Sequence, residues 1–291
     1  TITMNIQWYP GHMTKAKRAM KEDVKLVDLV IELVDARAPL ASRNPDIDSL
    51  AAGKGRVILL NKADLASEKA NAVWITYFES QGFQVMKIDA RAKATLKQLN
   101  ALIQEACKEK IERDRRRGIL NRPVRAMVVG IPNVGKSTFI NALAGKACAK
   151  TGNKPGVTKG KQWIRLNKNV ELLDTPGILW PKFEDQTVGL RLAFIGSIKD
   201  EILNTEELGG ELIRFLVQSY PGVLQEKYDV SESQDIYACL EEIAKNRHCL
   251  VRGSELDMEK AARLLLDDFR NGRIGRITLE FPQDYEETDG E

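Results

Sequence analysis

One stretch of the chain has the residue types and the spacing of a phosphate-binding loop. Residues 130–137, GIPNVGKS, match the pattern G-x-x-x-x-G-K-[ST] at every defined position. The apolar run AMVV before it predicts a buried strand, and the run STFINAL at its end predicts the start of a helix. In such a unit the glycines let backbone N–H groups turn onto phosphate oxygens, and the helix N-terminus adds partial positive charge. We therefore expect a nucleotide site here.

Single residues of this loop have expected roles. Lys136 is predicted to reach the β- and γ-phosphates and to act in catalysis, and the Ser137 hydroxyl is predicted to bind Mg²⁺. The neighbours predicted to line the nucleotide are Asn133, Val134, Gly135 and Thr138. The alternative is a glycine turn that binds nothing. Since kinases, ATPases and GTPases all carry this loop, it does not identify the base or the reaction.

The base is indicated by a second motif, Asn61-Lys62-Ala63-Asp64, which fits N-K-x-D and follows the apolar run RVILL. Guanine presents N–H donors at N1 and at its exocyclic amine, and the carboxylate of Asp64 can accept from both. Adenine would leave this carboxylate unpaired, at a cost in affinity. The stem of Lys62 is expected to lie over the purine plane, and Asn61 is expected to tie this loop to the phosphate-binding loop.

A third motif, Asp174-Thr175-Pro176-Gly177, fits D-x-x-G at the end of another predicted strand. Asp174 is expected to hold Mg²⁺ through water. The N–H of Gly177 is expected to meet the γ-phosphate, next to Pro176, so Gly177 is a catalytic candidate. The three motifs together indicate GTP and GDP, with Mg²⁺, as the ligands.

Two further candidates lie in neighbouring loops. Thr158 falls between the helix after the phosphate-binding loop and the next predicted strand, where its hydroxyl can complete the Mg²⁺ shell in the triphosphate state. The triplet Asp89-Ala90-Arg91 ends a predicted strand, and the N–H of Ala90 is predicted to contact the guanine carbonyl. Many loop threonines and alanines have no role, so both assignments depend on the other motifs.

The elements that must position these loops alternate along the chain. Apolar runs predict strands at residues 28–34, 56–60, 83–88, 126–129, 162–166 and 170–173, and helical patterns separate most of them, including one long helix at 95–117. This alternation is typical of an α/β fold with ligand loops at the carboxyl ends of parallel strands. After residue 200, helical patterns at 206–218, 232–246 and 255–270 follow without strands and predict an all-α domain.

Four parts are therefore predicted along the chain. Residues 1–25 form an N-terminal segment with the sequence WYPGHM and a basic helix, and residues 26–198 form the nucleotide-binding domain. Residues 199–285 form the helical domain, and residues 286–291 form an acidic tail.

Composition and charge bound the class of protein. Of the 291 residues, 43% are hydrophobic and 29% are charged, as in ordinary globular proteins. Neither a secretion signal nor an apolar run of ~20 residues is visible, so we expect a cytoplasmic protein without a membrane partner. The net charge of +3 is uneven, because residues 141–168 hold seven Lys or Arg and no acid. This asymmetry favours a polyanionic partner; a solvated basic face is the alternative.

The order of the motifs departs from that of Ras-like GTPases, in which the phosphate-binding loop comes first. Here N-K-x-D and the alanine loop precede it, so the chain resembles a circularly permuted Ras-like P-loop GTPase with a C-terminal all-α domain. More narrowly, it resembles the bacterial ribosome biogenesis GTPase A family over nearly its whole length. The segments that carry this resemblance are residues 8–13 (WYPGHM), 35–37 (DAR), 61–64, 130–138, 155–158 (PGVT) and 174–181 (DTPGILWP).

The resemblance implies an enzyme that hydrolyses GTP to GDP and phosphate in late assembly of the large (50S) ribosomal subunit. It implies binding of rRNA and pre-ribosomal particles in the GTP state, with ribosomal proteins as neighbours and with turnover stimulated by the particle. It also implies that the helical domain at 199–285 binds the ribosome through its RNA. We expect a monomer. Because the chain runs from D-x-x-G directly into the helical domain, the nucleotide state is expected to reorient that domain. One departure concerns the triplet at 89–91, where many GTPases have Ser-Ala-Lys.

A second departure concerns hydrolysis, because Ile178 follows Gly177 where Ras-like enzymes place a water-orienting Gln. A GTP-binding scaffold with little hydrolysis is therefore one alternative. A metabolic P-loop enzyme is another, which the N-K-x-D and D-x-x-G motifs disfavour. His12 is the candidate to position the attacking water, since a neutral imidazole can do so near working pH. A structural or RNA-contacting role is the alternative for His12.

Asn133 raises the question of a monovalent cation. It occupies the position that coordinates potassium beside the β- and γ-phosphates in a resembling subset of GTPases. Such an ion would neutralise developing charge as an arginine finger does. An asparagine with no role beyond the loop is the alternative.

Overall fold

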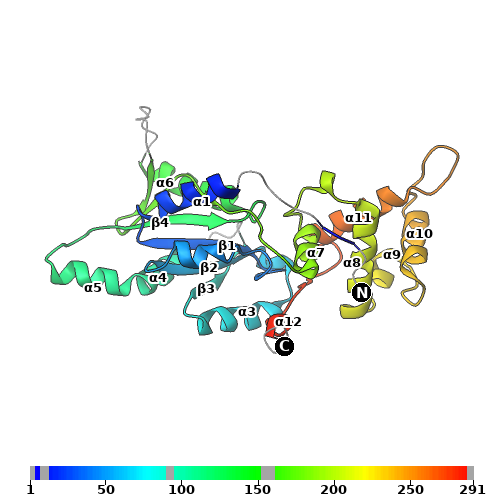
Figure 1. Ribbon diagram of the computed structural model, residues 1–291, viewed down its shortest axis with the longest axis horizontal. Helices are drawn as coiled ribbons and strands as arrows, with labels where there is room; N and C mark the ends of the chain where they lie inside the picture. Colours follow the sequence, from blue (N-terminus) through cyan, green and yellow to red (C-terminus); the bar gives the residue numbers. More distant parts are fainter. Residues whose placement is uncertain (1–3, 7–12, 90–94, 152–160, 287–291) are drawn as a thin grey trace.

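The computed structural model describes residues 4–6, 13–89, 95–151 and 161–286. A seven-stranded sheet and a group of helices lie next to each other along the long axis of the molecule, as Figure 1 shows. The strands are β1 (Leu29–Asp35), β2 (Gly55–Asn61), β3 (Gln84–Lys87), β4 (Val124–Gly130), β5 (Trp163–Asn167), β6 (Val170–Leu173) and β7 (Gly177–Ile178).

The strand order is β3-β2-β1-β4-β6-β5, with β7 paired to β4. All of these pairs are parallel except β5 with β6. The chain therefore builds from β1 outward to β3 at one edge and then returns to the middle, where β4 starts beside β1. Because the strands are parallel, the loops after β1, β2, β4 and β6 gather at one edge of the sheet, where ligand loops belong.

Helices cover both faces of the sheet. Their bounds are α1 (Met13–Val24), α2 (Asp46–Leu50), α3 (Glu68–Ser80), α4 (Thr95–Ala106), α5 (Lys108–Arg116) and α6 (Lys136–Thr151), with a 3₁₀ turn, η1, at Ala63–Leu65. On one face α1 packs near Val30, and on the other face α4 packs near Ile31. Successive strand residues point to opposite faces, so a strand covered on both sides must be apolar almost throughout. This explains why β1 is buried at every position.

The second part of the molecule consists of helices. Their bounds are α7 (Gln186–Phe194), α8 (Thr205–Ser219), α9 (Val223–Tyr228), α10 (Ile236–Asn246), α11 (Met258–Arg270) and α12 (Gln283–Glu286), with a 3₁₀ turn, η2, at Asp200–Ile202. The helices α8 and α11 pack closely, since a side chain at Gly209 would lie 2.6 Å from the Cβ of Ala262. Leu212 and Leu265 are fully buried in the same core.

The predicted strands and the parallel sheet are confirmed, but the predicted long helix at 95–117 is wrong. It is interrupted at Cys107, between α4 and α5. The break coincides with a change in burial, because α4 buries Leu99 and Ile103 whereas α5 buries no residue. A second difference is α7, for which no helix was predicted. Among the described residues no helix is both long and apolar enough to cross a bilayer.

The division into domains at residue 198 stays a prediction, and two features of the structure cross it. The helix α7, which lies before that boundary, packs against α8 and α11. Residues 276–280, which lie after it, return to the sheet part, where Leu279 donates its N–H to the carbonyl of Arg37 at 2.7 Å. Figure 1 shows this stretch ending at α12, beside α3.

Candidate nucleotide-binding site

The strand–loop–helix unit at β4 and α6 has the geometry expected of a phosphate-binding loop. Gly130 has no room for a side chain, because a Cβ would lie 2.9 Å from the carbonyl oxygen of Leu33. Asn133 and Gly135 take positive φ, 67° and 99°, which turns the loop sharply before the helix. Ser137 is exposed at the start of α6. Backbone N–H groups of the first helical turn have no partner within the helix, so this end suits phosphate oxygens.

Lys136 is buried inside this loop, with only 6% of its surface exposed, and its ammonium donates to the carbonyl of Ile131. Burial lowers the pKa of Lys136 to about 8. A phosphate group nearby would raise this pKa again, because an anion favours the charged ammonium. The predicted phosphate-binding lysine is therefore held at the loop, and an anionic ligand would stabilise its charged form.

The predicted link between the base-side loop and the phosphate-binding loop is confirmed. The amide of Asn61, at the end of β2, donates to the carbonyl of Val134 at 2.7 Å, and its oxygen accepts the N–H of Lys62 at 2.9 Å. This amide lies against Gly135, where a Cβ would collide with it. The ammonium of Lys62 donates to the carbonyl of Asn133 at 3.3 Å. Two strands far apart in the chain therefore present their loops side by side.

The base-side loop leaves its carboxylate open. Asp64 lies in the 3₁₀ turn η1 and is exposed, while Ala63 on the same turn is buried. The N–H of Ala63 donates to the carbonyl of Ile88 at 3.2 Å, which joins this turn to the end of β3. Asp89 follows there and is partly buried. The exposed carboxylate of Asp64, on a turn that is held by hydrogen bonds, is suited to accept from two neighbouring N–H donors.

Two buried residues beneath this site had no role assigned from the sequence. Asp35, at the end of β1, accepts from Nε of Arg37 at 3.0 Å and from Nη2 at 2.9 Å, and both side chains are 1% exposed. Burial opposes ionisation of Asp35, but the guanidinium of Arg37 outweighs it, so the pKa of Asp35 lies below its ordinary value. One indication of this pair was present in the sequence, because the charged residues Asp35 and Arg37 stand at the end of an apolar run that predicts a buried strand.

The γ-phosphate side is built from β6, β7 and α1. Gly177 is buried in β7 and pairs with Val129 of β4, immediately before the phosphate-binding loop. A side chain at Gly177 would lie 2.5 Å from Cε of Met20 in α1 and 2.8 Å from Cε of Met127. Pro176 lies next to it and is partly buried. The N-terminal helix α1 therefore packs directly on the predicted γ-phosphate contact.

The residues predicted to hold Mg²⁺ fit that ion in their chemistry. Ser137 offers a hydroxyl after β4, and Asp174 offers a carboxylate after β6, which is the parallel neighbour of β4. The Asp174 carboxylate also accepts from the hydroxyl of Thr175 at 3.0 Å. Hard oxygen donors are what Mg²⁺ prefers, and it is typically shared between one or two protein ligands and phosphates.

Some predicted residues are not placed. His12, Ala90, Arg91 and Thr158 lie outside the described residues. The exposed side chain of Thr138 follows Ser137 on α6, as expected for its place in the loop. Ile178, at the position of the missing Gln, is 44% exposed in β7. A hydrocarbon side chain there cannot orient water by hydrogen bonding.

Two hydrogen-bonded loops, one suited to a guanine base and the other to phosphates, follow strands of one parallel sheet. The chain enters this sheet at a middle strand, β1, and the phosphate-binding loop comes later. Together these features define the class of circularly permuted P-loop GTPases. Comparison with known proteins agrees: residues 125–251 match the family model described as 50S ribosome-binding GTPase. The chain is 50% identical to ribosome biogenesis GTPase A of Bacillus cereus, over 98% of this chain and 96% of that one. It is 33% identical to ribosome biogenesis GTPase A of Thermotoga maritima, over 96% and 95%.

A solved structure is similar as well. The crystal structure of GNP-bound YlqF from T. maritima is 29% identical, covers 92% of this chain and 99% of its own, and superimposes with a TM-score of 0.68. The chain belongs to the ribosome biogenesis GTPase A family. It is accordingly a guanine-nucleotide-binding enzyme that hydrolyses GTP.

Proposed function

We propose that this GTPase is a switch in late assembly of the large ribosomal subunit, and that it binds the pre-ribosomal particle and its rRNA in the GTP state. The observation that carries the nucleotide part is the link from Asn61 to Val134, which sets exposed Asp64 beside the phosphate-binding loop. The ribosomal part is supported by the names of the relatives, which are ribosome biogenesis GTPases. Cytoplasmic location and a monomeric state belong to the same proposal.

Each nucleotide-site residue has a proposed role. Asp64 accepts from the guanine edge, and Lys136 and the N–H of Gly177 bind the phosphates. Ser137 and Asp174 hold Mg²⁺, which would neutralise phosphate charge. The remaining proposed nucleotide contacts are Asn61, Lys62, Asp89, Ala90, Arg91, Asn133, Val134, Gly135, Thr138, Thr158 and Pro176, with Thr158 also a Mg²⁺ ligand.

Substitution of the base reader tests this assignment. Asp64→Asn removes a charged acceptor, so GDP binding should weaken by about 10- to 100-fold, the loss expected for a hydrogen bond to a charged group. Xanthine carries a carbonyl where guanine has its amine, and the new amide can donate to that carbonyl. XDP should therefore bind the variant more tightly than the wild type. Equal affinity of the wild type for ADP and GDP would refute the base assignment.

A potassium ion at Asn133 is part of the proposal. Its Nδ2 donates to the carbonyl of Gly196 at 2.9 Å, and this bond assigns the amide oxygen as the atom that faces other partners. An amide oxygen is a suitable ligand for a hard cation. GTP turnover should therefore be faster in potassium than in sodium at equal ionic strength. Equal rates on the particle-stimulated enzyme would remove the ion from the proposal.

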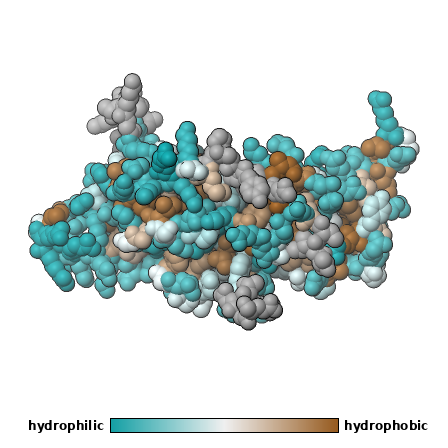
Figure 2. Space-filling view, viewed as in Figure 1, coloured by the Kyte–Doolittle hydropathy of each residue, from teal (hydrophilic) through white to brown (hydrophobic). Residues whose placement is uncertain are grey.

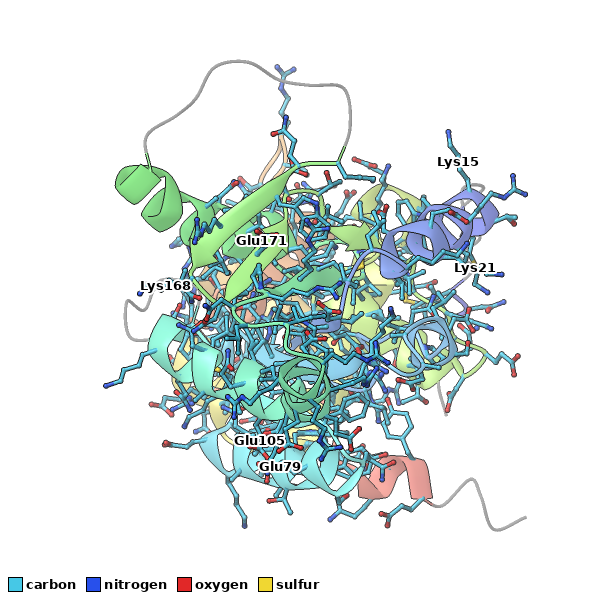
Figure 3. The ribbon with its side chains drawn as sticks, turned by 90° about the vertical axis from the view of Figure 1, so that its left-hand side faces the viewer. Lys15, Lys21, Glu79, Glu105, Lys168 and Glu171 are labelled. Carbon is cyan, nitrogen blue, oxygen red and sulfur yellow. The ribbon has the colours of Figure 1, made fainter. Side chains whose placement is uncertain are left out.

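The proposed RNA-binding surface combines α1, α5 and the basic run at 141–168, and the helical domain at 199–285 adds to it. On α1 the side chains of Lys15 and Lys21 project outward from the molecule (Figure 3). The helix α5 buries no residue and ends in basic side chains at Arg113, Arg115 and Arg116. Figure 2 shows hydrophilic side chains covering that end of the molecule. Solvated cations of this kind suit phosphate backbones.

Co-sedimentation with ribosomal particles tests the proposed partner. The protein should pellet with large-subunit precursors in the presence of a non-hydrolysable GTP analogue, and less with GDP or with small subunits. Binding should weaken steeply as salt rises, since phosphate contacts release counterions. A matched variant, Arg115→Gln with Arg116→Gln, should lower the salt slope by about 1–2. A flat salt response or equal pelleting with both nucleotides would contradict the proposal. The particle should also raise GTP turnover.

A further inference from the structure

The chain returns from the helical part to the sheet part after α11. We call residues 276–280, RITLE, the return segment. Figure 1 shows it running from α11 toward α12, beside α3. Its last four residues are buried at 4% exposure or less. Its first residue, Arg276, remains near the surface, with 46% of its side chain exposed.

Arg276 is bonded to the turn that holds the proposed guanine reader. Its Nε donates to the carbonyl of Ala66 at 2.7 Å, and its Nη2 donates to the carbonyl of Ala63 at 3.0 Å. These two carbonyls stand on either side of Asp64 along the chain. A single planar guanidinium therefore spans both ends of the turn, which a lysine ammonium cannot do in the same geometry.

Three further contacts continue along the return segment and its approach. The N–H of Ile277 donates to the carbonyl of Leu65 at 3.1 Å. The hydroxyl of Thr278 accepts the N–H of Ser67 at 3.0 Å. A Cβ at Gly272 would lie 2.6 Å from Cδ2 of Leu65, so the chain before the return segment also lies directly against this turn.

The turn needs external support because of its own geometry. The 3₁₀ turn η1 is three residues long, Ala63–Leu65, and is entered through Lys62 at a φ of 59°. A single 3₁₀ turn has few hydrogen bonds of its own, and positive φ is uncommon outside glycine. Carbonyls held from outside restrict the orientations that the Asp64 carboxylate can take.

We propose that Arg276 is a positioning residue for guanine recognition, because its guanidinium fork holds the turn that places Asp64. The inference rests on the proposed function, in which Asp64 reads the guanine edge. A carboxylate that accepts two N–H donors at once depends on its angle as well as its distance. Loss of the fork therefore lowers selectivity for the full guanine edge more than it lowers phosphate binding.

The same end of α11 also reaches the phosphate side. Arg270, the last residue of α11, donates to the carbonyls of Phe194 at 3.0 Å and Ala193 at 2.8 Å. Two residues further along, the carbonyl of Gly196 accepts from Nδ2 of Asn133 in the phosphate-binding loop. The end of α11 is therefore connected to the phosphate side through Arg270. The chain that follows α11 is connected to the base side through Arg276.

The test compares GDP with IDP, which keeps the N1–H of guanine but lacks the exocyclic amine. The ratio of their dissociation constants reports the second hydrogen bond to Asp64, and a general loss of stability does not change it. We would measure it by titration of the full chain for the wild type, Arg276→Ala and Arg276→Lys. Glu68→Gln is the matched control, because it removes the 3.7 Å ion pair of Arg276 and keeps both carbonyl bonds.

We expect Arg276→Ala and Arg276→Lys each to lower the IDP-to-GDP ratio by about fivefold, the effect of one weakened hydrogen bond, and Glu68→Gln to match the wild type. An unchanged ratio in Arg276→Ala overturns the inference. So does a normal Arg276→Lys together with a defective Glu68→Gln, because the charge and not the fork would then matter. A wild type that binds ADP as tightly as GDP overturns the proposed function itself, and that result is visible before any substitution.

Discussion

The base side and the γ-phosphate side of the nucleotide site are held by opposite ends of the chain. On the base side, the turn with Asp64 is bonded to residues 276–280, more than two hundred positions away. On the γ-phosphate side, Gly177 lies under Met20 of the N-terminal helix α1. The base side is thus bonded through polar groups, whereas the γ-phosphate side is packed through an apolar thioether.

The two kinds of contact suit different tasks in the proposed switch. Hydrogen-bonded carbonyls hold one arrangement, because each bond has a defined length and angle. A methionine packed on a glycine tolerates displacement, since its side chain is unbranched and adaptable. The base side is therefore suited to constant recognition of GDP and GTP, and the γ-phosphate side is suited to move α1 when the third phosphate is present or absent.

The largest expected effect is on the rate of GTP hydrolysis. His12→Ala should retain GTP affinity and particle binding but lose most of the particle-stimulated rate, by about 10²- to 10⁴-fold, as for other water-positioning groups. Single-turnover GTP hydrolysis with and without ribosomal particles measures it. An unchanged stimulated rate would reject the catalytic role and leave His12 as a structural or RNA-contacting residue.

Gly177→Ala should weaken the binding of GTP and leave that of GDP nearly unchanged, which would distinguish the γ-phosphate side from the base side. The added Cβ would lie 2.5 Å from Cε of Met20 and 2.8 Å from Cε of Met127, so these side chains and residue 177 must shift relative to one another. We expect part of that shift to take the N–H of residue 177 out of line with the γ-phosphate. GTP affinity should fall by about 10- to 100-fold while GDP affinity changes by less than about twofold, because only GTP uses this charged hydrogen bond. Gly145→Ala on α6 is the matched control, since a Cβ there meets nothing within 4 Å. An equal loss for both nucleotides would contradict the separation of the sides.

Asn61→Ala should affect both sides together. Its amide is the donor to the buried carbonyl of Val134, and it joins the base-side loop to the phosphate-binding loop. Leaving that carbonyl without its donor should weaken GDP and GTP equally, by about 5- to 30-fold. Asn167→Ala serves as the control, because Asn167 bonds Asn100 through its own amide, away from the proposed nucleotide contacts. A selective loss of GTP would place Asn61 on the γ-phosphate side instead.

Much of the site could be predicted because its signals are local. The phosphate-binding loop, Asn61 and Asp64 each follow an apolar run that forms a buried strand, and a parallel sheet brings such loops to one edge. The same local rules predicted the strands to within one or two residues at most ends.

The remainder depended on contacts between distant parts of the chain. Arg37 bonds the carbonyl of Arg270, 233 positions away, and no pattern along the sequence links the two residues. The fork of Arg276 and the packing of Met20 on Gly177 have the same character. The break at Cys107 was missed for a different reason, because basic residues with high helix propensity continued the helical pattern past the last buried position.

The smallest expected effect concerns the protonation of Lys136. In the free protein burial lowers its pKa to about 8, and bound phosphates should raise that pKa, so nucleotide binding takes up a proton above pH 8. Below pH 8 the ammonium is already charged and binding gains nothing from pH. GDP affinity should therefore be constant near pH 7 and weaker by about fourfold at pH 8.5, from the fraction deprotonated in the free protein.

The range from about pH 7 to about pH 8.5 lies below the pH at which guanine loses its N1 proton. The base side therefore does not contribute to the expected change in GDP affinity. Calorimetry at pH 8.5 in two buffers of different ionisation enthalpy would count the protons taken up, with an expected value near 0.8 if the bound pKa is well above 8.5. Lys136→Met is the control, and its weaker GDP binding should be independent of pH over this range. The same proton uptake in Lys136→Met would assign the titration to another group and would leave the phosphate side without this dependence on pH.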